Sequence, residues 1–209
     1  MKLSQPKLSY IELKSLEDCY KDQEFRDVHI IDNIDYEIKL NHLTFDGCLF
    51  EGIDFTHIQL NKIDFIDVVF DKCDLSNQVL EGQYYNRVVF KNCKLTGTSF
   101  IESRLKDVEF EQCLARYINF ASSCLSKANF IDCDLQEASF YDATLKKVDF
   151  DRVNLNLADL TSLHHSQLDV STSQIEGIII DMNSLKGLVV NSFQAVDLIE
   201  ILGVKVKDR

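Results

Sequence analysis

The repeat of apolar residues every five positions is the feature that most limits what this chain can fold into. From Phe45 to Val190 an apolar residue stands at nearly every position numbered by a multiple of five, and only Ala115 and His165 break the pattern. This period fits neither an α-helix, with about 3.6 residues per turn, nor a flat β-strand, with a period of about 2. A short fixed repeat sustained over this length predicts a solenoid.

A second period, of twenty residues, groups the pentads in fours. Two residue types recur at this interval: Phe50, Phe70, Phe90, Phe110, Phe130 and Phe150, and Cys73, Cys93, Cys113 and Cys133. If twenty residues form one coil, four pentads form four sides, and like residues stack in columns. Six of the seven glycines stand two positions after a multiple of five. Because glycine tolerates positive φ, we expect each corner of the coil at that position.

This pattern resembles the pentapeptide-repeat family. The resemblance implies an all-β fold, a right-handed quadrilateral β-helix, in which the central residue and the residue two before it point inward. The second of these positions holds small apolar residues, as such a fold requires: Cys48, Ile53, Ile58, Ile63, Val68, Cys73, Val88, Cys93, Ala128, Ala138 and Val148. Fold resemblance says much less about function.

The pentad pattern divides the chain into three parts. We expect a capping segment over 1–24, the β-helix over 25–190, and a C-terminal helix followed by a short strand over 191–209. Asn191 and Ser192 can cap this helix, and Gly203 can end it. A helix of this length needs a packing partner. It either covers the last coil or also joins two rods as a two-fold dimer, for which the expected interface is Phe193, Ala195, Leu198, Ile199 and Leu202.

Composition narrows the function classes. The chain has no apolar run long enough to cross a bilayer, and its start lacks a signal-peptide core. Seven cysteines without such a signal predict free thiols in the cytoplasm. The net charge of −12 disfavours direct nucleic-acid binding and favours basic partners. Motifs for phosphate loops, activated nucleophiles or zinc proteases do not occur, so we expect no catalytic, metal or cofactor-binding residues, no small-molecule substrate and no enzymatic activity.

Two other groups of residues have structural and functional interpretations. The cysteine column is small-residue packing, a redox-sensitive stack or, least consistently with the spacing, a metal site. The pair His164-His165 places a polar residue in an inward position, which favours a local bulge over a pair of ligands.

Outward charges separate by side. One side is predicted to carry an acidic face: Glu51, Asp71, Glu109, Glu111, Asp132, Asp149, Asp151 and Asp169. The neighbouring side carries basic residues: Arg87, Arg104, Lys106, Lys127, Lys146 and Lys147. These charges form ion-pair ladders between coils, or the acidic face imitates duplex DNA. Ile101, Tyr117 and Tyr141 are exposed apolar candidates for a protein contact.

The C-terminal stretch SLKGLVVNSFQAVDLIEILGVKV resembles the tail of the Qnr-type quinolone-resistance family, and VVFKNCKLTGTSF and CLARYINF are similar to its internal repeats. That resemblance implies a rod-shaped homodimer that binds DNA gyrase and topoisomerase IV and protects them from fluoroquinolones. The unbroken frame leaves no room for the projecting loops of many members, as in their loop-free chromosomal relatives. The alternative is a structural scaffold, or an immunity protein, with another partner.

Overall fold

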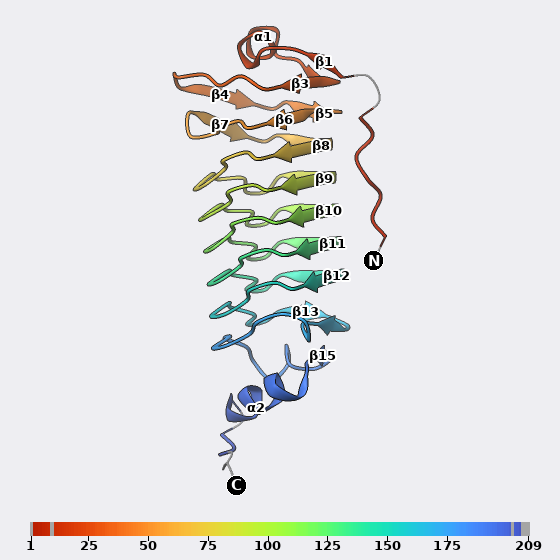
Figure 1. Ribbon diagram of the computed structural model, residues 1–209, viewed down its shortest axis with the longest axis vertical. Helices are drawn as coiled ribbons and strands as arrows, with labels where there is room; N and C mark the ends of the chain where they lie inside the picture. Colours follow the sequence, from red (N-terminus) through yellow and green to blue (C-terminus); the bar gives the residue numbers. More distant parts are fainter. Residues whose placement is uncertain (1, 9–10, 202, 206–209) are drawn as a thin grey trace.

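The computed structural model describes residues 2–8, 11–201 and 203–205. It shows a long β-helix whose coils stack in parallel, with a helix at each end (Figure 1). The elements in chain order are β1 (Glu12–Leu13), α1 (Leu16–Asp22), β2 (Phe25–Arg26), β3 (Val28–Ile30), β4 (Ile38–Asn41), β5 (Thr44–Asp46), β6 (Leu49–Glu51), β7 (Ile58–Asn61), β8 (Asp64–Asp71), β9 (Tyr84–Lys91), β10 (Arg104–Glu111), β11 (Cys124–Ile131), β12 (Thr144–Asp151), β13 (His164–His165), β14 (Leu168–Asp169), β15 (Leu188–Val189) and α2 (Ser192–Ile201).

Pairing at intervals of twenty residues confirms the predicted quadrilateral β-helix. Phe70 pairs with Phe90, and Phe90 with Phe110, all in parallel. The same interval begins where Phe25 pairs with Phe45 and ends where Asp169 pairs with Val189. Within 38–189, all of which the structure describes, this register leaves no inserted loop.

Each coil has four sides, numbered here by the central residues of one coil: Leu105 on side 1, Phe110 on side 2, Ala115 on side 3 and Phe120 on side 4. Strands β8 to β12 cross sides 1 and 2 without interruption. Side 4 carries the paired strands β4 and β7 near the start, and sides 3 and 4 otherwise carry isolated bridges and tight turns, such as the bond from Thr98 N to Leu95 O at 3.1 Å. Sides 1 and 2 are therefore the regular surface of the rod.

Corners lie two positions after each central residue, as predicted. Gly97 has φ +69° there, but most corners carry other residues, including Tyr117 at +60° and Leu157 at +62°. A residue with a Cβ is disfavoured in this conformation. The ladder of bonds to the coils on either side holds these residues in it, as for Tyr117 N, which donates to Gln136 O at 3.0 Å.

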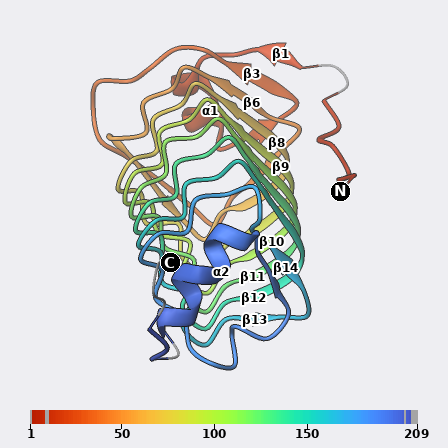
Figure 2. The same cartoon turned by 60° about the horizontal axis from the view of Figure 1, so that its bottom comes forward.

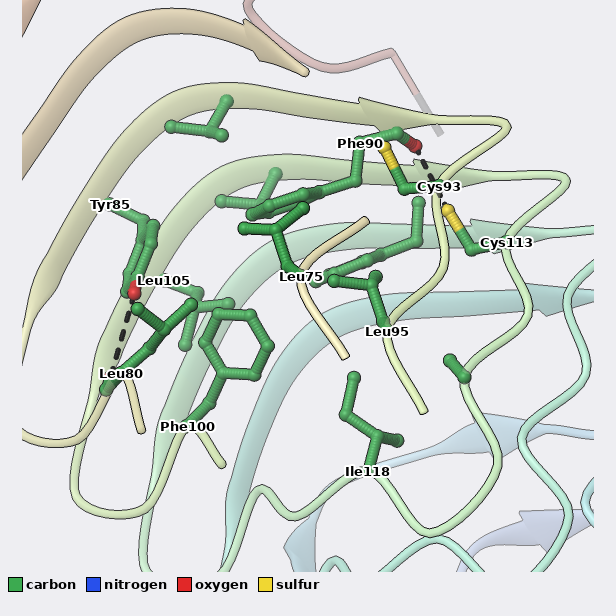
Figure 3. Packing of buried hydrophobic residues seen from close by; sticks show 14 of the residues in the cluster. Leu75, Leu80, Tyr85, Phe90, Cys93, Leu95, Phe100, Leu105, Cys113 and Ile118 are labelled. Carbon is green, nitrogen blue, oxygen red and sulfur yellow. Dashed lines mark hydrogen bonds between the residues drawn. The ribbon is translucent and has the colours of Figure 1, made fainter. Parts of the chain in front are cut away.

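The core consists of stacked columns (Figure 3). The rings of Phe90 and Phe110 lie 4.9 Å apart, and those of Phe110 and Phe130 lie 4.7 Å apart with an interplanar angle of 1°. All of these side chains are buried. Burying one such side chain stabilises a fold by about 1.5–3 kcal/mol, so the phenylalanine column is a principal source of stability.

The cysteine column packs as small buried side chains. Cys113 Sγ donates to Phe90 O at 3.3 Å, and Cys93 Sγ donates to Phe70 O at 3.3 Å. All seven cysteines are free thiols. In a neighbouring column, burial raises the pKa of the Cys48 thiol to about 12, so the thiol stays protonated at neutral pH. These observations favour the packing interpretation.

The coil is distorted after His165. Every corner position from Lys62 to Ser162, and again Gly177, has positive φ, whereas positions 167 and 172 do not. His165 is half-buried, and its Nε2 lies 2.8 Å from Ser184 O. A polar ring thus occupies an inward position by bonding to the backbone, which agrees with a local irregularity.

The N-terminal residues form a helix over the first coil and a separate segment outside the coils. Helix α1 lies over the first coil and buries Leu16 and Cys19, and Ser15 Oγ caps it by accepting from Asp18 N at 2.9 Å. Residues 2–8 lie outside the coils and run along the corner between sides 1 and 2 (Figures 1 and 2). The division at residue 24 stays a prediction.

Helix α2 lies across the other end of the rod (Figure 2). Asn191 Oδ1 caps it by accepting from Phe193 N and Gln194 N, at 3.0 and 3.1 Å. Gln194 Nε2 ties it to the last coil by donating to Val170 O at 2.9 Å. Leu202 and Val206 lie outside the described residues, so the short strand after the helix stays a prediction. Neither described helix is long and apolar enough to span a membrane.

Candidate partner-binding face

The acidic face falls on side 2, where two outward columns run along the rod. The column before the central phenylalanines contains Leu49, Val69 and Val89 in the first coils and changes to Glu109 in β10. Asn129 and Asp149 continue it in register. The acidic character of this column is therefore confined to the half of the rod nearer α2.

Most of the predicted acids form ion pairs with basic side chains on the surface of the same chain. Glu111 lies 3.0 Å from Lys91, and Arg152 lies 2.7 Å from Asp132 and 2.6 Å from Asp151. Two more of these acids have such partners. Glu51 lies 3.1 Å from His29 and 3.7 Å from Lys72, and Asp71 lies 3.8 Å from Lys72. The ion-pair ladders that the sequence suggested are thus present.

A shallow groove brings four of the predicted acids together. Glu109, Asp149, Asp151 and Asp169 line it with Asn129, around a volume of about 530 Å³. Glu109 Oε2 accepts from Asn129 Nδ2 at 3.4 Å, and Asp169 Oδ1 accepts from Ser171 N at 2.9 Å. We call the four carboxylates the acidic groove.

Hydrogen bonds keep acids of this side ionised. The Arg152 guanidinium lowers the pKa of Asp132, and the hydroxyl and amide of Ser171 lower the pKa of Asp169. The charge of these groups therefore persists at neutral pH. Of the other predicted acids, Glu51 and Asp71 lie further up side 2, and Glu111 and Asp132 lie outside the groove lining.

The ion pairs could have been predicted from the spacing of opposite charges in the sequence. Asp67 and Arg87, Asp74 and Lys94, Asp107 and Lys127, Lys91 and Glu111, and Asp132 and Arg152 are each separated by twenty residues. Once a coil of twenty is inferred, opposite charges at this interval predict a pair in adjacent coils.

The apolar candidates lie on another part of the rod. Tyr141 and Ile101 share one outward column of side 4, opposite side 2, and Tyr117 stands at the corner between sides 3 and 4. Tyr117 and Tyr141 are 51% and 49% exposed, whereas Ile101 is half-buried. They cannot form one continuous surface with the acidic groove.

No group of three or more His, Cys, Asp or Glu side chains among the described residues is arranged to hold a metal ion. The groove is a charged surface on side 2. Its regular spacing comes from coils about 4.8 Å apart.

Comparison with family models identifies the repeats. Residues 63–140 match a model described as a pentapeptide repeat region, and residues 123–161 match one described as pentapeptide repeats (8 copies). Together with the twenty-residue register, these matches show that residues 63–161 consist of pentapeptide repeats. Comparison with curated proteins gave no match.

Solved structures give more distant likenesses. A trypsin-treated variant of QnrB1, described as a plasmid-mediated fluoroquinolone resistance protein, is 18% identical with a TM-score of 0.42, covering 87% of this chain and 89% of that one. The pentapeptide repeat protein Rfr23 from the cyanobacterium Cyanothece 51142 is 19% identical with a TM-score of 0.37, covering 56% of this chain and 91% of that one. The fold is established by the coil register and by the matched repeat regions.

Proposed function

We propose that this protein binds a type II topoisomerase, DNA gyrase or topoisomerase IV, in the cytoplasm and protects it from fluoroquinolones without catalysing a reaction. The acidic groove is the observation that carries the proposal. It sets Glu109, Asp149, Asp151 and Asp169 on one regular side of a narrow rod. The resemblance of the C-terminal sequence to Qnr-type proteins suggests the partner.

Electrostatics indicate how the contact would form. The DNA-binding surface of a topoisomerase is basic because it binds phosphates. A column of carboxylates on a chain with a net charge of −12 attracts such a surface and repels nucleic acid itself. The rod would therefore occupy the enzyme in place of DNA and would not bind DNA directly.

We also propose that the protein acts as a homodimer joined through α2. Phe193 is 84% exposed, and Val196, Ile199 and Ile201 are exposed as well. On the same helix, Leu198 packs against the core of its own rod and Ala195 is half-buried. A helix with apolar residues on all sides is normally covered on all sides. A second copy of α2, related by a two-fold axis, would cover the exposed residues.

The proposed activity is tested in a supercoiling assay. Purified gyrase is inhibited with ciprofloxacin, and the protein is added over a graded range to micromolar concentration. We expect supercoiling to recover as the protein is added. If the protein neither restores supercoiling nor inhibits it in the absence of drug, the proposal is wrong and a scaffold with another partner takes its place.

A further inference from the structure

Residues 2–8 form a strap that lies in an extended conformation against the outside of the rod. Ser4 N donates to Asp107 Oδ1 at 3.0 Å, and Lys7 N donates to Asp67 Oδ1 at 2.9 Å. Both carboxylates stand at corners between sides 1 and 2, in β10 and β8. Figures 1 and 2 both place this segment outside the coils.

The spacing of the strap matches the spacing of the coils. A polyproline II chain advances about 3.1 Å per residue and has three residues per turn, so the amides of Ser4 and Lys7 can face the same side about 9 Å apart. Two coil spacings of about 4.8 Å each separate Asp107 from Asp67 and give nearly the same length. Every third amide of a peptide in this conformation can therefore reach a carboxylate on every second coil.

The corner is built to accept such a peptide. With the strap in place, Asp67 and Asp107 are only 6% and 4% exposed, although their positions face outward. Between them, Arg87 Nε and Nη2 donate to the two oxygens of Asp67 at 2.5 and 2.6 Å. These bonds within the rod fix the Asp67 carboxylate, so the acceptor is in place before a peptide arrives.

The strap is held by few contacts. Leu3 is 6% exposed, but Lys2, Ser4, Gln5 and Lys7 are exposed. Two hydrogen bonds from backbone amides, the buried Leu3 side chain and the partly buried Pro6 and Leu8 are the described contacts that offset the loss of conformational freedom of this segment. Such a segment is able to exchange between a bound and a released state while the rod stays folded.

We propose that this corner is a binding site for an extended peptide segment of a partner protein, and that residues 2–8 fill it until that segment displaces them. The site recognises two backbone N–H groups three residues apart and an apolar side chain just before the first of them, as Leu3 stands before Ser4. This proposal is independent of the topoisomerase and of the acidic groove.

The test uses the full chain and a fluorescent peptide of the sequence of residues 2–8, acetylated and amidated at its ends. Binding is measured by fluorescence anisotropy to the wild type and to Leu3→Asp, which releases the strap without touching the core. We expect at least tenfold tighter binding to Leu3→Asp, because its site is empty. Circular dichroism verifies that both chains are folded, and equal binding to both would overturn the proposal.

Two matched controls identify the contacts. A peptide N-methylated at the amides of Ser4 and Lys7 should bind Leu3→Asp at least tenfold more weakly than one N-methylated at Gln5, whose amide is not one of the two bonded amides. Adding Asp107→Asn to Leu3→Asp should weaken binding, whereas adding Asp142→Asn, at a corner away from the strap, should not. If the two methylated peptides bind equally, the site does not read the amides and the proposal fails.

Discussion

At the level of single residues, the chain follows the rule of the pentad closely. Phe90, Phe110 and Phe130 stack in register because their spacing of twenty equals one coil, and this was predictable from the periodicity. Corners were predictable from glycine positions, yet most of them are held by other residues such as Leu157. The pentad frame predicted those corners as well, whereas the residue types did not indicate them, because the surrounding ladder overrides the local preference against positive φ.

Truncation of a stacked phenylalanine should strongly lower the free energy of unfolding. Phe110→Ala removes a buried ring that contacts rings on both sides, and we expect it to lower the free energy of unfolding by about 3–5 kcal/mol. Tyr141→Ala, at an exposed position, should change it by less than about 0.5 kcal/mol. Urea titration followed by circular dichroism measures both, and similar small losses would contradict inward stacking.

Two glycine corners should differ in their tolerance of a methyl group. A Cβ at Gly187 would lie 2.5 Å from Ser166 O, whereas a Cβ at Gly52 meets nothing within 4 Å. Both residues have positive φ, so Gly52→Ala should cost roughly 1 kcal/mol from backbone strain alone. Gly187→Ala adds a clash with backbone and should cost at least about 2 kcal/mol. Equal melting temperatures of the two variants would be inconsistent with the close approach at Gly187.

At the level of elements, the repeat pattern predicts neither the position of the strap nor the orientation of α2. The strap has no pentad repeat, and it binds through backbone amides, which leave no trace in residue types. The sequence predicted α2 itself, but not its orientation: Leu198 faces its own rod while Ile199 is exposed. That choice depends on how the last coil ends, which periodicity does not encode.

The hold of the strap on Asp67 should weaken in acid. Burial raises the pKa of Asp67, but the bonds from Arg87 and from the amide of Lys7 outweigh it and bring the pKa below its usual value of 3.8. A lowered pKa means that this stabilisation is complete above pH 3.8 and is lost as pH falls through the lower folded-state value. We expect the NMR exchange protection of the Lys7 amide to fall below pH 3.8.

The Leu95 amide, which donates to Leu114 O at 2.7 Å in the core, provides the internal reference for that titration. Its protection should persist where that of Lys7 is lost. If the two amides lose protection together, the strap does not open separately from the rod.

The dimer proposal predicts that two substitutions in α2 affect the mass and the melting temperature differently. Phe193→Asp places a charge on the exposed side and should halve the mass measured by light scattering, with no loss of melting temperature. Leu198→Asp should also lower the melting temperature, because that side chain packs on its own rod. A mass of one chain for the wild type would rule out the dimer.

At the level of the whole molecule, the charge distribution explains more than the net charge. Lys91 pairs with Glu111 and Arg152 with Asp132 across adjacent coils of side 2, and Arg152 also pairs with Asp151 of the acidic groove. The groove is the part of this side where four of the predicted acids lie together. The sequence predicted all four groove acids as part of a longer face. Glu51 and Asp71 lie apart from the groove and pair with His29 and Lys72.

Direct binding to gyrase, measured with charge reversals on two sides of the rod, tests the central claim most directly. Glu109→Lys with Asp149→Lys changes the acidic groove, and Glu102→Lys with Asp159→Lys makes the same change in charge on side 4 and at its corner with side 1. Biolayer interferometry should show at least tenfold weaker binding for the groove pair and nearly unchanged binding for the side 4 pair. Equal affinities for the two variants would contradict the account.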